Sequence, residues 1–419
     1  MLPYLTADIA PVPGAFKERP EDFRVEEIPL YEPCGEGEHL YLQFEKTKLT
    51  TRQAVDQVAR ALKVPPLDCG IAGLKDAQAV TVQTMSVKGV DAALAEKLEI
   101  PGLKVLNLNR HKNKLRMGHL RANRFEIKLR DVPQDRFEDV RRIFEILKQR
   151  GVPNYFGAQR FGMRGDTGKV GKAIVLRDYT LAVRLIAGMP GPSDPEKIHE
   201  ARTLFDAGRF AESSHLWSSG FRQCAALCRA MERTGGQAEK ALFSLDTAWL
   251  WFFITAFQSE LFNDVLTRRL SSLEQIWTGD LAFKHVNGAV FLVEDAAAEQ
   301  PRADAFEISP SGPLYGFKMI MPGGEQARLE AEVLAASGVK SEDFFRPGIL
   351  KCQGARRALR FPLEDAAWQA GQDDAGEYFE VSFTLPPGAY ATTVLREIFK
   401  QDVSDSAEGQ ARPLGLLRP

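Results

Sequence analysis

Apolar and polar residues alternate in several short segments, which is typical of β-strands covered on one face only. The clearest alternation lies in residues 23–28, 40–44, 125–130 and 378–385, and residues 80–87 are also predicted to form a strand. We predict helices over residues 50–62, 135–150, 246–270 and 391–400. Thr50 and Asp135 stand at the expected N-caps of the first two helices. Together these elements predict an α+β fold in which helices pack against a mixed or antiparallel sheet.

The pattern changes beyond Tyr155. Residues 167–270 are predicted to be mainly helical, and residues 280–360 to form short strands and loops rich in Gly and Pro. A chain of 419 residues is long for a single core. We therefore expect two domains, one of which is inserted in the other.

The composition is that of an ordinary globular protein, with 44% hydrophobic and 26% charged residues. We expect no membrane association, because the most apolar run, residues 248–257, is too short to span a bilayer. The first residues lack the pattern of a secretory signal, and five sparse cysteines favour reduced thiols. We therefore expect a cytoplasmic protein.

The net charge of −2 hides an uneven distribution. Nine Lys or Arg residues lie between Lys104 and Arg130, against one acidic residue, Glu126, so this stretch has a local charge of +8. We interpret residues 110–130 as a basic, aromatic-bearing strand that contacts an RNA or DNA backbone. A solvated charged face is the alternative interpretation.

The most compact candidate for a reactive group lies at residues 72–76, with the sequence Ala-Gly-Leu-Lys-Asp. This segment places the carboxylate of Asp76 next to Lys75 and shortly before a predicted strand. A reactive carboxylate at this position would be close to the basic stretch. Alternatively, Asp76 closes a surface turn, which is a frequent role of aspartate.

A second dense segment, residues 154–162, combines three aromatic residues, two glycines and Arg160. It could stack bases and hold a phosphate, or it could be a tightly packed domain junction. Cys224 and Cys228 have no partners at metal-ligand spacing, so we expect them to pack in the core. The pair Gly323-Gly324 belongs to no phosphate-binding loop. We therefore expect neither a metal nor a cofactor.

Several segments together closely resemble the TruD family of tRNA pseudouridine synthases. They occur in order along the chain, at residues 73–76, 79–81 and 83, then 110–112, 114–116 and 118, then 154–162, and finally 390–392 and 394–397. The match extends from about residue 14 to residue 400. The resemblance implies a pseudouridine synthase catalytic domain formed by residues 1–152 and 363–419, with a family-specific α/β domain inserted at residues 153–362.

The resemblance also implies a tRNA substrate, with uridine 13 of the D-arm as the target and Asp76 as the nucleophile. We expect no obligate protein partner. Six more residues are expected to bind the uridine or to hold Asp76, namely Lys17, Phe23, Lys75, Asn123, Phe125 and Tyr390. Four are expected on the RNA backbone, namely Arg110, Lys112, Lys114 and Arg116. Phe125 stands where other pseudouridine synthases have a tyrosine, and Tyr390 where this family commonly has a phenylalanine.

The reaction breaks the N1–C1′ bond of uridine, turns the uracil and rejoins it through C5, without oxidation or hydrolysis. An ionised aspartate suits this chemistry because it needs no separate base. It could attack C6 of the uracil or C1′ of the ribose, or remove the 2′ proton. Two other functions stay open, a non-catalytic RNA-binding or folding factor with the same fold and an N-glycosylase that releases uracil.

Overall fold

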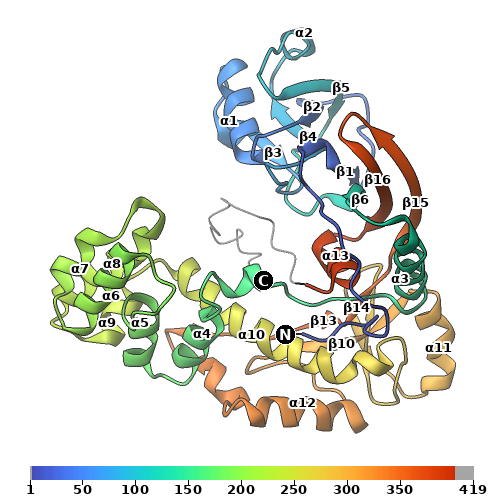
Figure 1. Ribbon diagram of the computed structural model, residues 1–419. Helices are drawn as coiled ribbons and strands as arrows, with labels where there is room; N and C mark the ends of the chain where they lie inside the picture. Colours follow the sequence, from blue (N-terminus) through green and yellow to red (C-terminus); the bar gives the residue numbers. More distant parts are fainter. Residues whose placement is uncertain (1, 402–419) are drawn as a thin grey trace. The chain divides into compact units, whose positions relative to one another are not determined.

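The structure is a computed structural model, and it describes residues 2–401 (Figure 1). The chain divides into two compact units. One unit, which we call the sheet unit, contains Tyr4–Val152 and the C-terminal stretch from Phe361. The other, which we call the helical unit, contains Pro153–Arg360. The chain passes from one unit to the other within two short strands, β7 (Val152–Pro153) and β14 (Arg360–Phe361).

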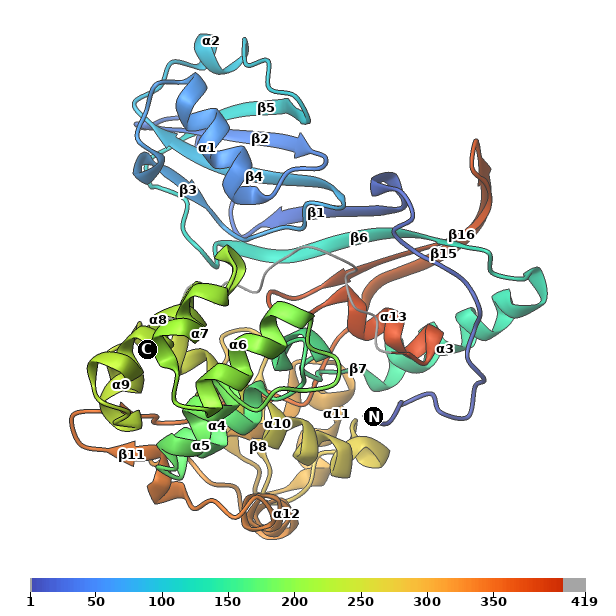
Figure 2. The same ribbon diagram turned by 60° about the vertical axis from the view of Figure 1, so that its left-hand side comes forward.

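A twisted mixed sheet forms the centre of the sheet unit (Figure 2). Its strands run in the order β15-β16-β6-β1-β4-β2-β5, and β3 pairs with β4. The pairing of β1 with β4 is parallel, whereas the other pairings are antiparallel. The strands are β1 (Phe23–Pro29), β2 (His39–Lys46), β3 (Cys69–Ile71), β4 (Val80–Lys88), β5 (Leu103–His111), β6 (Leu120–Arg130), β15 (Glu364–Asp373) and β16 (Gly376–Leu385).

Helices cover one face of this sheet. They are α1 (Thr51–Ala61), α3 (Phe137–Arg150) and α13 (Ala391–Phe399), and a short helix α2 (Ala92–Ala95) precedes β5. Val58 of α1 packs in one core with Phe44 and Met85, and Phe144 of α3 lies 5.9 Å from Phe383 between ring centroids. The strand register places Phe44 and Phe383 on the same face, so α1 and α3 cover that face together.

Local sequence explains where two of these helices begin. The predicted N-cap Thr50 is confirmed, because its side chain accepts a hydrogen bond from the backbone N–H of Gln53. The predicted N-cap Asp135 is wrong. A 3₁₀ turn occupies Gln134–Arg136, and α3 begins only at Phe137.

The helical unit matches the predicted character of residues 167–270. Its helices are α4 (Thr167–Val175), α5 (Tyr179–Ala187), α6 (Glu196–Asp206), α7 (Phe210–Leu216), α8 (Arg222–Arg233), α9 (Ala238–Phe243), α10 (Thr247–Arg269), α11 (Ala296–Asp304) and α12 (Gly324–Ala336). Its strands are β8 (Leu281–Lys284), β9 (Val290–Leu292), β10 (Ile308–Leu314), β11 (Phe345–Arg346), β12 (Leu350–Lys351) and β13 (Ala355–Ala358). The expectation of only short strands and loops in residues 280–360 is therefore wrong for α11 and α12.

Candidate active site

Asp76 lies in the loop that joins β3 to β4, and two elements hold the backbone of this loop. Lys46, at the end of β2, donates hydrogen bonds to the backbone oxygens of Asp76 (2.6 Å) and Leu49 (2.8 Å). The backbone N–H of Lys75 donates to the hydroxyl of Thr51 in the first turn of α1 at 2.8 Å. The side chain of Asp76 nevertheless remains 48% exposed. The loop thus presents a carboxylate to solvent on a firmly held backbone.

Lys17 is the charged partner of that carboxylate. Its ammonium donates to Oδ2 of Asp76 at 2.8 Å, and its side chain is only 4% exposed. The same ammonium lies 4.3 Å from the centroid of the Phe23 ring, within reach of a cation–π interaction. The backbone of Lys17 adopts a left-handed conformation, with φ of +58°. The chain accepts this less favourable conformation where it directs the ammonium at Asp76.

Lys75 does not pair with Asp76, although it precedes it directly. Its ammonium donates to Oδ1 of Asn123 and lies 3.3 Å from Oε2 of Glu27. The strand register explains this arrangement, because Glu27 of β1 and Asn123 of β6 lie opposite each other. Burial raises the pKa of Glu27 and lowers the pKa of Lys75, while the attraction between the two charges opposes both changes.

Lys46 is a buried cation beneath the loop that carries Asp76. It is fully buried, and it shares the covered face of β2 with Leu40, Leu42 and Phe44. Burial lowers the pKa of Lys46 to about 8, although the charge of Asp76 acts in the opposite direction. A change in the protonation of Lys46 would therefore act directly on the backbone that carries Asp76.

The aromatic residues predicted at the site have different accessibilities. Phe23 and Phe125 are 4% and 7% exposed and lie edge to face, with ring centroids 6.0 Å apart. Phe125 also stacks on Phe383 at 5.5 Å. Tyr390, at the N-cap of α13, is 48% exposed. It follows β16 by five residues, and the last residue of that strand, Leu385, pairs with Asn123. A flat ligand could therefore stack on Tyr390, whereas Phe23 and Phe125 mainly support the site.

Of the four basic residues predicted on the RNA backbone, Arg110 lies far from Asp76. The interpretation of residues 110–130 as one strand is wrong, because β5 ends at His111 and β6 begins at Leu120. Arg110 pairs with Leu40, whereas Lys46 at the other end of β2 contacts Asp76. Six residues of extended strand separate these ends by about 20 Å.

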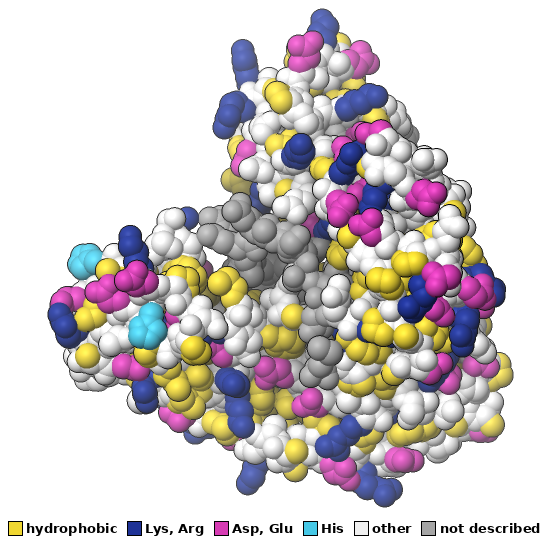
Figure 3. Space-filling model, in the orientation of Figure 1, with side chains coloured by type: hydrophobic (Ala, Val, Ile, Leu, Met, Phe, Trp, Pro, Cys, Tyr) yellow, Lys and Arg dark blue, Asp and Glu magenta, His cyan; other side chains and the backbone are white. Residues whose placement is uncertain are grey.

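Three of the four residues also have partners within the protein. Arg110 donates to the backbone oxygen of Val90, Lys114 to that of Leu67, and Lys112 forms an ion pair with Glu36. Arg116 is exposed. In the view of Figure 3, Lys and Arg side chains of the sheet unit are interspersed with Asp and Glu. Lys112 and Arg116 are thus the members of the set with the most exposed charge.

The segment at residues 154–162 packs within the helical unit. The side chain of Asn263 on α10 hydrogen-bonds both the backbone N–H and the backbone oxygen of Phe156, each at 2.9 Å. Asn154 is buried and donates to the oxygen of Ala358 at 2.8 Å, and Arg160 donates to the hydroxyl of Thr255 at 2.6 Å. These contacts favour the packing interpretation of the segment. Cys224 and Cys228 are likewise buried in α8.

Two residues of the site, Lys46 and Glu27, were not among the predicted ones. Both are charged residues in phase with apolar residues of a strand, since Lys46 follows Leu42 and Phe44, and Glu27 follows Phe23 and Val25. A charge at a position where alternation requires an apolar side chain is the signal that would have identified them.

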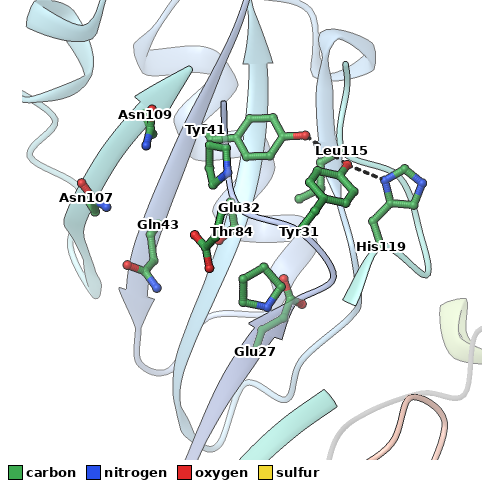
Figure 4. Close-up of a pocket in the computed structure, with 12 residues that line it drawn as sticks. Glu27, Tyr31, Glu32, Tyr41, Gln43, Thr84, Asn107, Asn109, Leu115 and His119 are labelled. Atoms are coloured by element: carbon green, nitrogen blue, oxygen red, sulfur yellow. Dashed lines mark hydrogen bonds between the residues drawn. The ribbon is translucent and has the colours of Figure 1, made fainter. Parts of the chain in front are cut away.

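A pocket also borders Glu27 (Figure 4). Its lining includes the amide side chains of Gln43, Asn107 and Asn109, and the hydroxyl of Tyr31, which hydrogen-bonds Nδ1 of His119 at 2.8 Å. None of the residues predicted from the sequence lines this pocket.

Within residues 2–401, no helix is long and apolar enough to cross a membrane. Nor does this part of the chain bring three or more His, Cys, Asp or Glu side chains together in a group that could hold a metal ion.

Comparison with known proteins identifies the family. The family model described as tRNA pseudouridine synthase D (TruD) matches residues 2–398. The tRNA pseudouridine synthase D of Syntrophotalea carbinolica is 44% identical over 408 residues, which cover 96% of this chain and 100% of that protein. The enzyme of the same name from Geobacter metallireducens is 44% identical over 397 residues, with 95% and 97% coverage.

A solved structure supports the same assignment. A crystal structure described as a candidate tRNA pseudouridine synthase D from Methanosarcina mazei matches with a TM-score of 0.85 at 28% identity, covering 96% of each chain. Both the predicted resemblance and the predicted α+β pseudouridine synthase fold are thereby confirmed. This chain belongs to the TruD family of tRNA pseudouridine synthases, which are isomerases.

Proposed function

We propose that this protein converts uridine 13 in the D-arm of tRNA to pseudouridine, with the carboxylate of Asp76 as the reacting group. The sheet unit would perform the chemistry, because it contains Asp76 and each of the three lysines around it. The observation that carries the proposal is the contact between Asp76 and Lys17. It combines a half-exposed carboxylate with a buried ammonium 2.8 Å away.

This arrangement suits a carboxylate that must keep one orientation. The ammonium of Lys17 donates a hydrogen bond to one oxygen, Oδ2, and so fixes its position. The other oxygen, Oδ1, remains for the substrate. Lys46 and Thr51 hold the backbone, so little reorganisation is needed when the uridine arrives.

The reaction requires the target uridine to leave its stack, which costs a few kcal/mol. Stacking on an aromatic ring returns about 1–3 kcal/mol per base. Tyr390 has the exposed ring for this contact. Asn123, on the face of β6 that the helices cover, would bind the edge of the uracil. Phe23 and Phe125 would support the floor of the site from below.

The overall conversion moves no atom to or from the solvent in its net balance. The N1–C1′ bond breaks and a C5–C1′ bond forms. One proton leaves C5, and N1 of the product carries one. Asp76 could take part by attacking C6 or C1′, or by removing the 2′ proton.

A single incubation tests the proposal. An unmodified tRNA transcript with U13 is treated with the protein, digested to nucleosides and mapped, in parallel with a transcript that has C13. Pseudouridine at position 13 of the first transcript, and none in the second, is the expected result. Free uracil would show an N-glycosylase instead. Bound but unchanged RNA would show a non-catalytic binding factor. Pseudouridine elsewhere would retain the isomerase but overturn the choice of U13.

A further inference from the structure

We propose that Glu27 and Lys75 are positioning residues that fix the side-chain amide of Asn123, so that its NH2 group faces a carbonyl oxygen of the bound uracil. The inference rests on the proposed function and assigns Asn123 a defined hydrogen-bonding role in it. Glu27 and Lys75 would act through Asn123 and would not contact the reacting atoms.

The geometry begins with two adjacent residues that point in different directions. The side chain of Asp76 is 48% exposed, whereas that of Lys75 is 8% exposed. The hydroxyl of Thr51 accepts a hydrogen bond from the backbone N–H of Lys75 at 2.8 Å. This bond fixes the backbone of Lys75 so that its side chain points into the protein. The side chain of Lys75 therefore lies behind the loop that carries Asp76.

Two oxygens meet the ammonium of Lys75 there. Oε2 of Glu27 lies 3.3 Å from it, and Oδ1 of Asn123 accepts a hydrogen bond from it. The side chain of Glu27 is only 3% exposed. Glu27 balances the charge of Lys75, which would otherwise be buried without a counterion. The close packing extends to Gly73, where an added Cβ would lie 3.3 Å from Nζ of Lys75 and 3.4 Å from Oε2 of Glu27.

The ammonium determines which way round the amide of Asn123 lies. An ammonium only donates hydrogen bonds, so it must face Oδ1, and a flipped amide would set two donors against each other. Within residues 2–401, the NH2 group of Asn123 makes no hydrogen bond of its own. It is therefore available as a donor to a ligand.

A fixed NH2 donor matches the chemistry of uracil. Uracil presents carbonyl acceptors at O2 and O4, whereas cytosine has an amino donor in place of O4. An NH2 donor of fixed orientation forms a hydrogen bond with a carbonyl, whereas it is repelled by an amino group at the same position. Where the donor faces O4, the ion pair of Glu27 and Lys75 would thus contribute to uridine selection without touching the base, whereas a donor that faces O2 would meet a carbonyl in either base.

A double-mutant cycle tests this inference. Lys75→Met is made in the wild-type protein and in Asn123→Ala, and kcat and KM are measured on the U13 transcript. Lys63→Met, at an exposed lysine of the same unit, is the matched control. Lys75→Met should lower kcat/KM by about tenfold in the wild type. In the Asn123→Ala background the same change should have less than about a twofold effect. An equal loss in both backgrounds would overturn the inference.

A chemical probe separates positioning from a merely structural role. Transcripts with 2-thiouridine or 4-thiouridine at position 13 weaken one carbonyl acceptor at a time. The wild type should be slowed selectively by one of the two, and both Lys75→Met and Asn123→Ala should lose this selectivity. Unchanged selectivity in Lys75→Met would overturn the inference.

Folding and the underlying activity are controlled separately. Thermal melts identify any variant that fails to fold. If Lys75→Met fails to fold, the cycle is repeated with Glu27→Gln, which keeps the shape of the side chain. Failure of the wild-type protein to form pseudouridine would overturn the proposed function itself. Conversion by the wild type with additive effects of the two substitutions would overturn only the positioning role.

Discussion

Lys46 provides a quantitative prediction, because its burial links the stability of the sheet unit to pH. Its pKa is lowered from 10.5 to about 8. This shift means that folding destabilises the charged form relative to the neutral form by about 3 kcal/mol. Asp76 partly offsets this effect, whereas the nearby charge of Lys75 adds to it. Lys46→Met removes the titrating group and also the donor to the backbone oxygens of Asp76 and Leu49.

The sign follows from the protons bound in each state. Between pH 8 and pH 10.5 the unfolded chain holds the Lys46 proton and the folded protein has lost it, so this group adds stability as the pH rises. The wild type should gain about 1 kcal/mol relative to Lys46→Met between pH 8 and pH 9. For a unit of this size, that amounts to a change of about 2–4 °C in the difference between the two Tm values.

Thermal unfolding of both proteins at pH 7, 8 and 9 measures this difference. Lys63→Met is the control, because Lys63 is an exposed lysine of the same unit. Its difference from the wild type should stay constant with pH. A constant difference for Lys46→Met as well would refute the argument from burial. The same variant should also lower kcat, since Asp76 loses a charged donor to its backbone.

Three further predictions concern the other contacts of the site. Lys17→Met should lower the single-turnover rate by about 10–30-fold, because it removes a charge-assisted hydrogen bond from a half-exposed carboxylate; an unchanged rate would remove Lys17 from the mechanism. Tyr390→Ala should weaken productive tRNA binding by about 5–100-fold through lost stacking, whereas Tyr390→Phe should retain it; equal losses in a binding titration would show that the hydroxyl matters and the ring does not. Lys112→Glu with Arg116→Glu should weaken tRNA binding and reduce the slope of log K against log salt by about 1.5–2; a slope equal to that of the wild type would show that this loop does not contact the RNA.

Much of the sheet unit follows from the sequence, because most of its strands show at least near alternation of apolar and polar residues. That alternation correctly predicted β1, β2, β4, β6 and β16. It did not predict β15, in which exposed residues predominate and both faces mix polar residues with Ala, Trp or Gly. An edge strand of this kind buries too little on either side to leave a pattern.

The helix α12 was missed for a different reason. Its buried residues include Gln326 and Glu330, and Glu330 forms a bidentate ion pair with Arg356. Polar residues thus occupy the packing face, so the apolar helical period is absent. In α11, Pro301 lies inside the helix and Ala303 is its buried residue. The sequence of α11 therefore also lacks the apolar period of a helix.

The sequence singled out the segment 72–76 that carries Asp76, but not the contacts of this residue. Sequence alone left Lys17 and Lys75 as equal candidates for its partner. The choice depends on a left-handed turn at Lys17 and on the pairing of β1 with β6, which brings Glu27 and Asn123 to Lys75. Both are consequences of tertiary structure, and neither leaves a local pattern in the chain.

The central claim is that the carboxylate of Asp76 carries out the chemistry while other residues bind the RNA. Asp76→Asn tests it most directly, because the substitution keeps the side chain's shape, and Lys46 binds only the backbone at this position. Single-turnover conversion of a U13 transcript is measured together with tRNA affinity. We predict no detectable pseudouridine, with an affinity within about threefold of the wild type. Conversion at a rate close to that of the wild type would contradict the account.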